Sequence, residues 1–189
     1  MTHTGGFRIF TILTSIWGTV YGLVGPFYVV YISNISGGME KLGIAFSIMI
    51  LVQSVASYFV GRYSDRLGRK PFLLLTGLMD AAILIAFTVS TKTYQIYILQ
   101  GLLGITNAMS LTLRGVILGD LTEKEKRGAD IGKFNAIVGV FSGIGLALGG
   151  YITKHYGLKA IFYLGAVIIA CSSLLLFFIH ETRNIPEND

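Results

Sequence analysis

The amino-acid sequence predicts an all-α integral membrane protein with six transmembrane helices. Three observations lead to this fold class: apolar residues make up 53% of the 189 residues, the mean hydropathy is +0.68, and the apolar residues form six long runs separated by short polar segments. A helical run of about 20 apolar residues crosses roughly 30 Å of hydrocarbon while satisfying its own backbone hydrogen bonds. The bundle is expected to cover residues 8–180, with spans at 9–32, 42–60, 71–90, 94–119, 131–152 and 160–179, and polar tails at 1–7 and 181–189.

The basic residues predict the direction in which these spans cross the membrane. With the N-terminus inside, ten Lys and Arg residues lie in cytoplasmic segments and four lie outside, while Arg114 lies within a span. Cytoplasmic loops are enriched in basic residues, so both termini of this multi-pass protein are expected on the cytoplasmic side of the cell (inner) membrane. This bias also accounts for the net charge of +5, so no nucleic-acid partner is expected.

The first two spans carry few polar side chains at depth. Tyr21 lies well inside the first span, where its hydroxyl needs a hydrogen-bond partner or water. Gln53 is the one strongly polar side chain of the second span, and Ser57 belongs to a stripe of small residues that permits close helix packing. We therefore predict that Tyr21 and Gln53 line a cavity and that Ser57 lies at a helix contact.

A charged segment, residues 61–70, joins the second span to the third and reads GRYSDRLGRK. Five of its ten residues are charged, compared with 13% of the whole chain. Charges in hydrocarbon cost several kcal/mol each, so this segment is expected to be a short loop in water. Its two glycines, Gly61 and Gly68, are expected to permit a tight turn.

Asp80 lies at mid-depth in the third span, where an ionisable residue is a candidate functional residue by default. Two interpretations stay open. Asp80 either takes part in proton coupling, or it is a structural partner of Arg114 or of a nearby hydroxyl.

The fourth span has one polar face. Gln100, Asn107 and Arg114 recur every seven residues, which is two helical turns, and Ser110 joins the same face. A polar face on a membrane helix is expected to meet a partner or a water-filled cavity rather than lipid. These four residues are therefore predicted to line a substrate cavity.

The fifth span is rich in glycine, and its Asn135 is a further candidate cavity residue. Gly139 and Gly143 have the four-residue spacing that lets helices approach closely, and Gly149 and Gly150 follow. These glycines are predicted to pack on another helix or on a second copy of the chain. The sixth span is apolar and offers no candidate chemistry.

Signatures of an enzyme are missing from the sequence. Cys171 is the single cysteine, so the chain can form neither an intrachain disulfide nor a cysteine metal cluster. Paired catalytic carboxylates, a nucleophile motif and a phosphate-binding loop are likewise not visible. No cofactor, no metal and no enzymatic activity are expected.

The two halves of the chain carry an internal repeat. Gly61, Gly68 and Lys70 recur with identical spacing as Gly150, Gly157 and Lys159, at an offset of 89 residues. One copy follows the second span and the other follows the fifth, on opposite sides of the membrane. This pattern predicts two three-helix repeats of inverted topology.

The segment GRYSDRLGRK resembles the signature loop between helices 2 and 3 of the major facilitator superfamily of secondary transporters. Six positions match that pattern: Gly61, Asp65, Arg66, Gly68, Arg69 and Lys70. The resemblance implies that Asp65 and Arg69 form a cytoplasmic gate cluster with Asp120, at the end of the fourth span. In the fourth- and fifth-span motifs, Tyr97 stands where the family usually has Arg, and Leu146 stands where antiporter branches have Pro.

A usual member of that family has two six-helix halves, and this chain resembles one of them. The resemblance implies a secondary active transporter that works by alternating access in the lipid bilayer, here as a parallel homodimer around a small-molecule substrate. The drug:proton antiporter branch is the most similar, which favours proton-coupled efflux of small organic compounds. Sugar or organic-anion uptake is an alternative, and so is a non-transporting fragment or half of a larger transporter.

Overall fold

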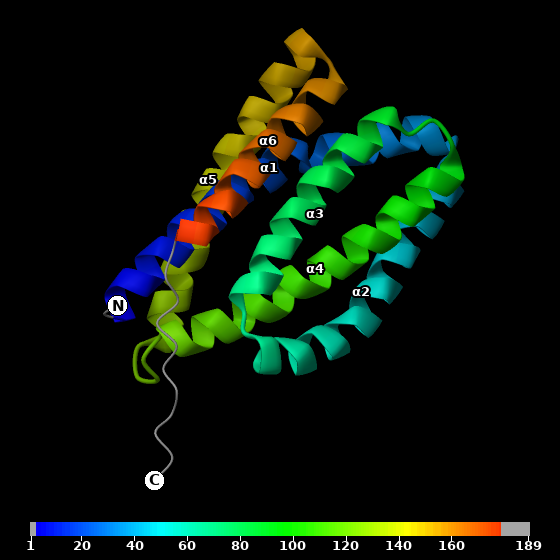
Figure 1. Cartoon of the computed structure of the whole chain (residues 1–189). Coiled ribbons are helices and arrows are strands. Elements are labelled where there is room, and N and C mark those ends of the chain that lie inside the picture. The colour runs from blue at the N-terminus through cyan, green and yellow to red at the C-terminus, as the bar shows by residue number, and fades with distance from the viewer. Residues whose placement is uncertain (1–2, 179–189) are drawn as a thin grey trace.

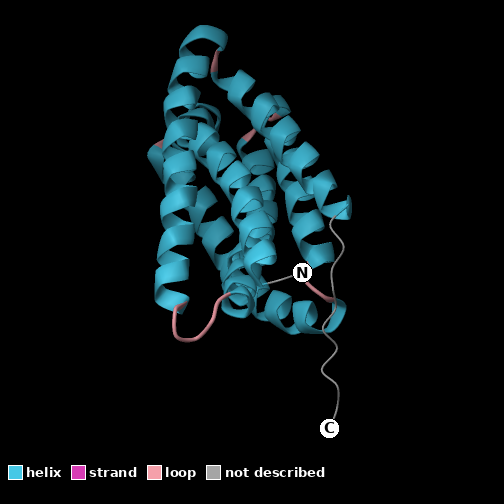
Figure 2. Ribbon diagram, turned by 90° about the vertical axis from the view of Figure 1, so that its left-hand side faces the viewer, coloured by secondary structure: helices cyan, strands magenta, loops and turns pink. Residues whose placement is uncertain are grey.

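The structure is a computed structural model that describes residues 3–178. It consists of six helices joined by short turns (Figures 1 and 2). Within the described residues no strand occurs, so the predicted all-helical fold is confirmed. The helices are α1 His3–Ser36, α2 Met39–Leu67, α3 Lys70–Val89, α4 Thr93–Leu121, α5 Arg127–Tyr156 and α6 Leu158–Phe178.

Each predicted span corresponds to one helix, and the helices α1, α2 and α5 extend beyond their apolar runs at both ends. A helix keeps its backbone hydrogen bonds in water and in lipid alike, so it does not have to stop where the apolar run stops. By length and composition, α1 to α5 are able to cross a membrane, and α6 contributes a shorter apolar stretch at Leu158–Leu174.

The charged segment 61–70 is not the loop that the sequence predicted. Helix α2 continues to Leu67, so most of this segment is helical. Charged side chains at a helix end reach water without any break in the backbone, which is why the charge pattern did not mark the end of α2. The turn rests on Gly68, which has a positive φ of 85°. Gly61 instead lies inside α2, near the Thr112 side chain of α4.

The helices pack in a pattern that is consistent with a three-helix repeat. The most extensive contacts join α1 to α5, α2 to α4 and α3 to α6, and α3 also packs on α4 while α6 packs on α1 (Figure 1). An internal repeat of three helices relates α1 to α4, α2 to α5 and α3 to α6. When each helix is replaced by its counterpart, the α1–α5 contact becomes α4–α2, the α3–α4 contact becomes α6–α1, and the α3–α6 contact is unchanged. An offset of three helices also inverts the direction of every helix, as in an inverted repeat.

The two turns predicted by the repeat have the same backbone conformation. Gly68 after α2 has φ 85° and ψ 166°, and Gly157 after α5 has φ 84° and ψ 166°. Each N–H donates to the carbonyl four residues earlier, on Ser64 at 3.1 Å and on Thr153 at 3.0 Å. A positive φ is easily reached only by glycine, so the sequence repeat is also a structural one.

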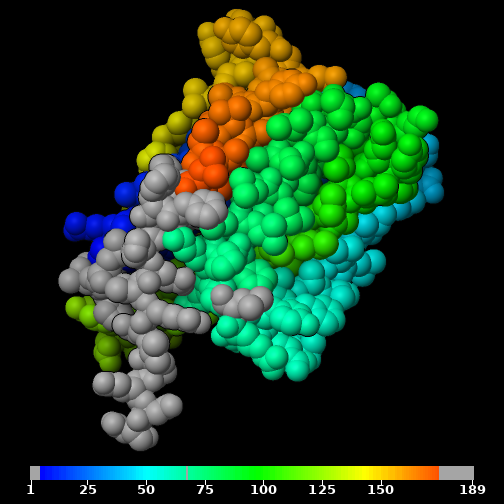
Figure 3. Space-filling model, viewed as in Figure 1, coloured from blue at the N-terminus to red at the C-terminus, as the bar shows by residue number. Residues whose placement is uncertain are grey.

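The core of the bundle lies between α1, α3, α4 and α6. Its fully buried members include Phe87, Ile96, Ile161 and Phe162. Side chains fill the space that the ribbons leave open between α3 and α4 in Figure 1, as the space-filling view shows (Figure 3). Helices α2 and α5 lie at the edges, and few of the residues in their apolar spans are buried.

Glycines bring α5 into direct backbone contact with α1. A Cβ atom on Gly145 would clash with the Thr19 carbonyl, and one on Gly149 would clash with the Leu23 carbonyl. Small residues of this kind let membrane helices approach closely. Gly149 was predicted as a packing residue, whereas Gly139 and Gly143 have no atom of the described residues within 4 Å of such a Cβ and so make no helix contact in that part of the chain.

Candidate functional site

An ion pair joins the α2–α3 turn to the end of α4. The Arg69 guanidinium Nη1 contacts Oδ2 of Asp120, and the two side chains are 31% and 54% exposed. Arg69 is the residue that precedes α3, and Asp120 lies in the last turn of α4. Because both side chains are exposed to solvent, the ion pair contributes less than about 1 kcal/mol to stability.

The third predicted member of this charged group is not in the ion pair. Asp65 and Arg66 are exposed on the last turn of α2, and neither has an ion-pair partner among residues 3–178. Within the described residues, Arg69 and Asp120 are thus brought together, while Asp65 takes no part in the ion pair.

A second polar contact lies deep in the bundle, between α1 and α3. The Tyr21 hydroxyl donates to Asp80 Oδ2 at 2.7 Å. Asp80 is 4% exposed, whereas Tyr21 is 42% exposed. The other carboxyl oxygen, Oδ1, is buried and has no hydrogen-bond partner among the described residues. An acidic group in the middle of the membrane therefore has one donor, and that donor also reaches the surface of the chain.

Two residues of α4 complete the surroundings of this contact. The Thr106 hydroxyl lies beside Asp80, although it donates to the Leu103 carbonyl at 3.1 Å. Arg114 is half-buried and lies close enough to Tyr21 to act on it electrostatically. We call Tyr21, Asp80, Thr106 and Arg114 the mid-membrane cluster. Thr106 was missed by the sequence analysis because it is off the seven-residue stripe, and only the packing of α3 on α4 places it opposite Asp80.

Gln100 does not lie on an open cavity, contrary to the prediction. It is fully buried, and neither its amide nitrogen nor its amide oxygen has a hydrogen-bond partner among the described residues. The Tyr28 hydroxyl lies nearby and is buried without a partner as well. The polar stripe of α4 therefore faces the core at this level, because α1 and α3 cover it. A buried amide of this kind costs about 1–3 kcal/mol while it is unpaired.

The remaining predicted cavity residues are spread over separate surfaces. Asn107 is half-buried and its amide contacts the Met49 sulfur of α2 at 3.5 Å. Gln53 and Ser110 are half-buried on α2 and α4, and Asn135 is exposed on α5. Ser57, predicted at a helix contact, is half-buried and donates to the Gln53 carbonyl of its own helix at 2.8 Å.

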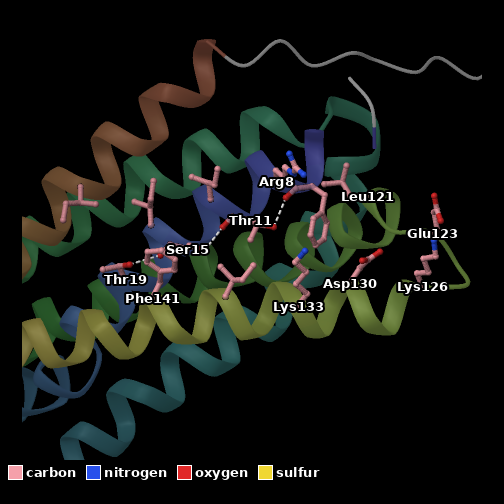
Figure 4. A pocket seen from close by; sticks show the side chains of 15 residues that line it. Arg8, Thr11, Ser15, Thr19, Leu121, Glu123, Lys126, Asp130, Lys133 and Phe141 are labelled. Carbon is pink, nitrogen blue, oxygen red and sulfur yellow. Dashed lines mark hydrogen bonds between the residues drawn. The ribbon is translucent and has the colours of Figure 1, made fainter. Parts of the chain in front are cut away.

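A pocket of about 790 Å³ lies elsewhere, along α1 and α5 at the end of the bundle that holds the N-terminus (Figure 4). It contains none of the predicted cavity residues. Its lining residues are Phe7, Arg8, Thr11, Ile12, Ser15, Ile16, Thr19, Leu121, Glu123, Lys126, Asp130, Lys133, Ile137, Phe141 and Ile168. No spacing rule in the sequence pointed to it, because its walls come from helices that are distant in the chain.

The fold and these sites define a multi-pass membrane protein built from an inverted three-helix repeat. The sequence profile of the Major Facilitator Superfamily matches residues 10–189. The chain belongs to this family, and it is a transporter and not an enzyme.

Several named relatives are similar to this chain. An uncharacterized MFS-type transporter of Bacillus subtilis, YitZ, is 29% identical over 154 residues, which cover 82% of this chain and 94% of YitZ. The multidrug resistance protein MdtG of Salmonella dublin is 32% identical over 172 residues, and that of Proteus mirabilis is likewise 32% identical; each match covers 87% of this chain and 42% of MdtG. The chain therefore spans less than half the length of the MdtG relatives, and nearly all of YitZ.

Proposed function

We propose that this chain is a secondary active transporter of small molecules that works by alternating access, with two six-helix units around one central cavity. The family and the internal repeat support the mechanism. The match to 42% of MdtG supports a unit that corresponds to one half of a full-length relative. The name of those relatives, multidrug resistance protein, favours efflux of small organic compounds as the activity.

The observation that carries this proposal furthest is the contact between Tyr21 and Asp80. Asp80 is buried at mid-depth, yet Tyr21, its one donor among the described residues, is 42% exposed on α1. Such an arrangement suits a carboxyl group that exchanges a proton with a cavity through a single hydroxyl. In the proposed cycle, a substrate that contacts Tyr21 alters this hydrogen bond and so couples its own movement to a proton on Asp80.

The gate is proposed to lie at the α2–α3 turn. Making and breaking the ion pair between Arg69 and Asp120 would favour one of the two states, with Asp65 and Arg66 as the alternative charges beside it. Gly68 supports the gate by holding the turn, and Gly61 supports it by placing α2 close to α4. This end is proposed to be cytoplasmic because the basic residues gather here.

The second unit is proposed to be another copy of this chain. The exposed apolar faces of α2 and α5 sit at the edges of the bundle, and Gly139 and Gly143 of α5 are open for close approach by a neighbouring helix. Parallel pairing follows from the charge bias, which requires both copies to insert in the same direction. The cavity residues Asn107, Ser110 and Arg114 would then each occur twice.

Organic-anion transport is the alternative that a specific observation favours. Arg114 is half-buried and forms no ion pair or hydrogen bond with the described residues. Two such guanidinium groups around a central axis would suit a carboxylate or a phosphate on the substrate. A lipophilic cation would be disfavoured by the same pair of charges, so the two substrate classes are distinguishable.

The experiment is transport by the pure chain in proteoliposomes under an imposed pH gradient, with ethidium as the cationic probe and a fluorescent dicarboxylate as the anionic one. Gradient-driven ethidium movement supports drug efflux, and dicarboxylate movement supports the alternative. Asp80→Asn should remove the dependence on the gradient while Glu40→Gln, an exposed acid at the start of α2, leaves it intact. Equal gradient dependence in both variants would remove Asp80 from the coupling role.

Native mass spectrometry of the same preparation tests the second copy. A dimer is expected. Transport by a preparation that is entirely monomeric would overturn the dimer, and a dimer that moves neither probe would overturn the two substrate classes. A monomer without transport would direct the search to a different six-helix partner.

A further inference from the structure

The pocket along α1 and α5 has a charged end and an apolar end. It follows α1 from Phe7 to Thr19, which are twelve residues apart. At about 1.5 Å per residue this is roughly 18 Å, slightly more than one leaflet of a bilayer with about 30 Å of hydrocarbon. The charged residues lie at the end near the start of α5, and the apolar residues continue along both helices (Figure 4).

The charged end contains five side chains that have no partners in the described part of the chain. Arg8, Lys126 and Lys133 supply three positive charges, and Glu123 and Asp130 supply two negative ones. No ion pair or side-chain hydrogen bond joins any of them to residues 3–178. The cluster thus has a surplus of one positive charge, and it has carboxylates that can accept hydrogen bonds.

The apolar end does not require a polar ligand. Ile12, Ile137 and Phe141 are among its lining residues. The hydroxyl groups along α1 are already used, because Thr11, Ser15 and Thr19 each donate to the carbonyl four residues earlier, at 2.7, 2.7 and 2.9 Å. A hydrocarbon chain can therefore lie along the apolar end of the pocket without leaving any of these hydroxyl groups unpaired.

We infer that this pocket binds a phospholipid with one negative charge and hydroxyl groups on its head, of the phosphatidylglycerol class. The phosphate would lie among Arg8, Lys126 and Lys133 and neutralise their surplus charge. The hydroxyl groups of the head would donate to Glu123 and Asp130, and one acyl chain would follow α1 toward Thr19. Basic pockets between membrane helices are suited to anionic headgroups for this reason. A zwitterionic lipid leaves the surplus charge unmatched.

The test compares lipids and charge-matched variants of the full chain. Purified protein is titrated with phosphatidylglycerol or phosphatidylethanolamine of identical acyl chains, and bound lipid is counted by native mass spectrometry. The double variant Arg8→Gln, Lys133→Gln removes two charges from the pocket. The control Arg62→Gln, Lys124→Gln removes the same two residue types from exposed positions outside the pocket.

The pocket variant is expected to lose phosphatidylglycerol affinity by about 25-fold, because each basic side chain beside an anionic headgroup contributes about a fivefold change. The control should retain it.

Ile12→Trp tests the apolar end without any change of charge: Ile12 is 62% exposed, so the indole is expected to fill the groove and displace the acyl chain. Equal binding by pocket and control variants, or equal affinity for both lipids, would overturn the inference, and so would unchanged binding by Ile12→Trp. Each variant is first checked for an unfolding temperature close to that of the wild type.

Discussion

Tyr21 and Asp80 are joined by a 2.7 Å hydrogen bond although 59 residues separate them in the chain. The bond fixes α1 to α3 at mid-depth, and its two ends differ sharply, since Asp80 is buried and Tyr21 is partly exposed. Any group that reaches Tyr21 can therefore act on a carboxyl that it cannot touch directly. This relationship gives the first prediction.

Tyr21→Phe should lower the free energy of unfolding by about 1–3 kcal/mol, because it removes the one donor that the described residues supply to a buried carboxyl group. The measurement is thermal or denaturant unfolding in mild detergent. A double-mutant cycle with Asp80→Asn isolates the contact, and Tyr58→Phe, on an exposed phenol of α2, is the matched control. If Tyr21→Phe costs no more in the presence of Asp80 than in its absence, the hydrogen bond does not contribute.

Gly145→Ala should weaken the contact between α1 and α5. The added methyl group meets the Thr19 backbone carbonyl, which cannot move aside as a flexible side chain can. Overpacking of this kind costs about 1–3 kcal/mol. Gly132→Ala, on the same helix with open space around its Cβ, should be neutral or slightly stabilising because alanine favours helices. Equal effects of the two substitutions on unfolding would show that the close approach is wrong.

The two repeated turns should respond alike to alanine. Gly68→Ala and Gly157→Ala each force a positive φ on a residue with a Cβ, at a cost of roughly 1–2 kcal/mol. Gly128→Ala is the control, since Gly128 lies in the first turn of α5 without a positive φ. Unfolding midpoints of the three variants provide the comparison, and a neutral effect at one turn alone would mean that the two turns are not equivalent.

Exchanging the charges of the gate should separate stability from transport. Arg69→Asp or Asp120→Arg alone should abolish transport while changing the unfolding free energy by less than about 1 kcal/mol, because the pair is exposed. The double variant restores opposite charges and should regain part of the activity in the proteoliposome assay. Loss of activity in both single variants without recovery in the double variant would contradict a gate based on this ion pair.

The number and the approximate positions of the helices were predictable from the sequence because hydrocarbon imposes length and apolarity directly. The repeat was predictable for a different reason: Gly68 and Gly157 stand where the backbone needs a positive φ, and few other residues tolerate it. Both properties are local, so they can be read from the sequence without knowing which helices pack against one another.

The environment of individual polar residues was much less predictable. The seven-residue spacing placed Gln100 and Arg114 correctly on one face of α4, but it does not say which helix covers that face at each level. Gln100 is fully buried, and Arg114 is half-buried near Tyr21. Glycine spacing was incomplete in the same way: Gly139 and Gly143 fit the packing motif but contact no described residue, whereas Gly149, which was predicted, and Gly145, which was not, touch α1. The orientation of a helix about its own axis decides such contacts, and spacing alone does not fix it.

The shared geometry of Gly68 and Gly157 separates how this chain folds from how it sits in the membrane. The two turns face opposite sides of the bilayer, since three helices lie between them, and yet they use one backbone conformation. The turns therefore do not determine the orientation of the chain in the membrane. The charges nearby determine it, and they are denser beside Gly68 than beside Gly157. If a few basic residues were moved from the turn at Gly68 to the turn at Gly157, the chain would be expected to insert in the opposite orientation. The backbone of neither turn would have to change.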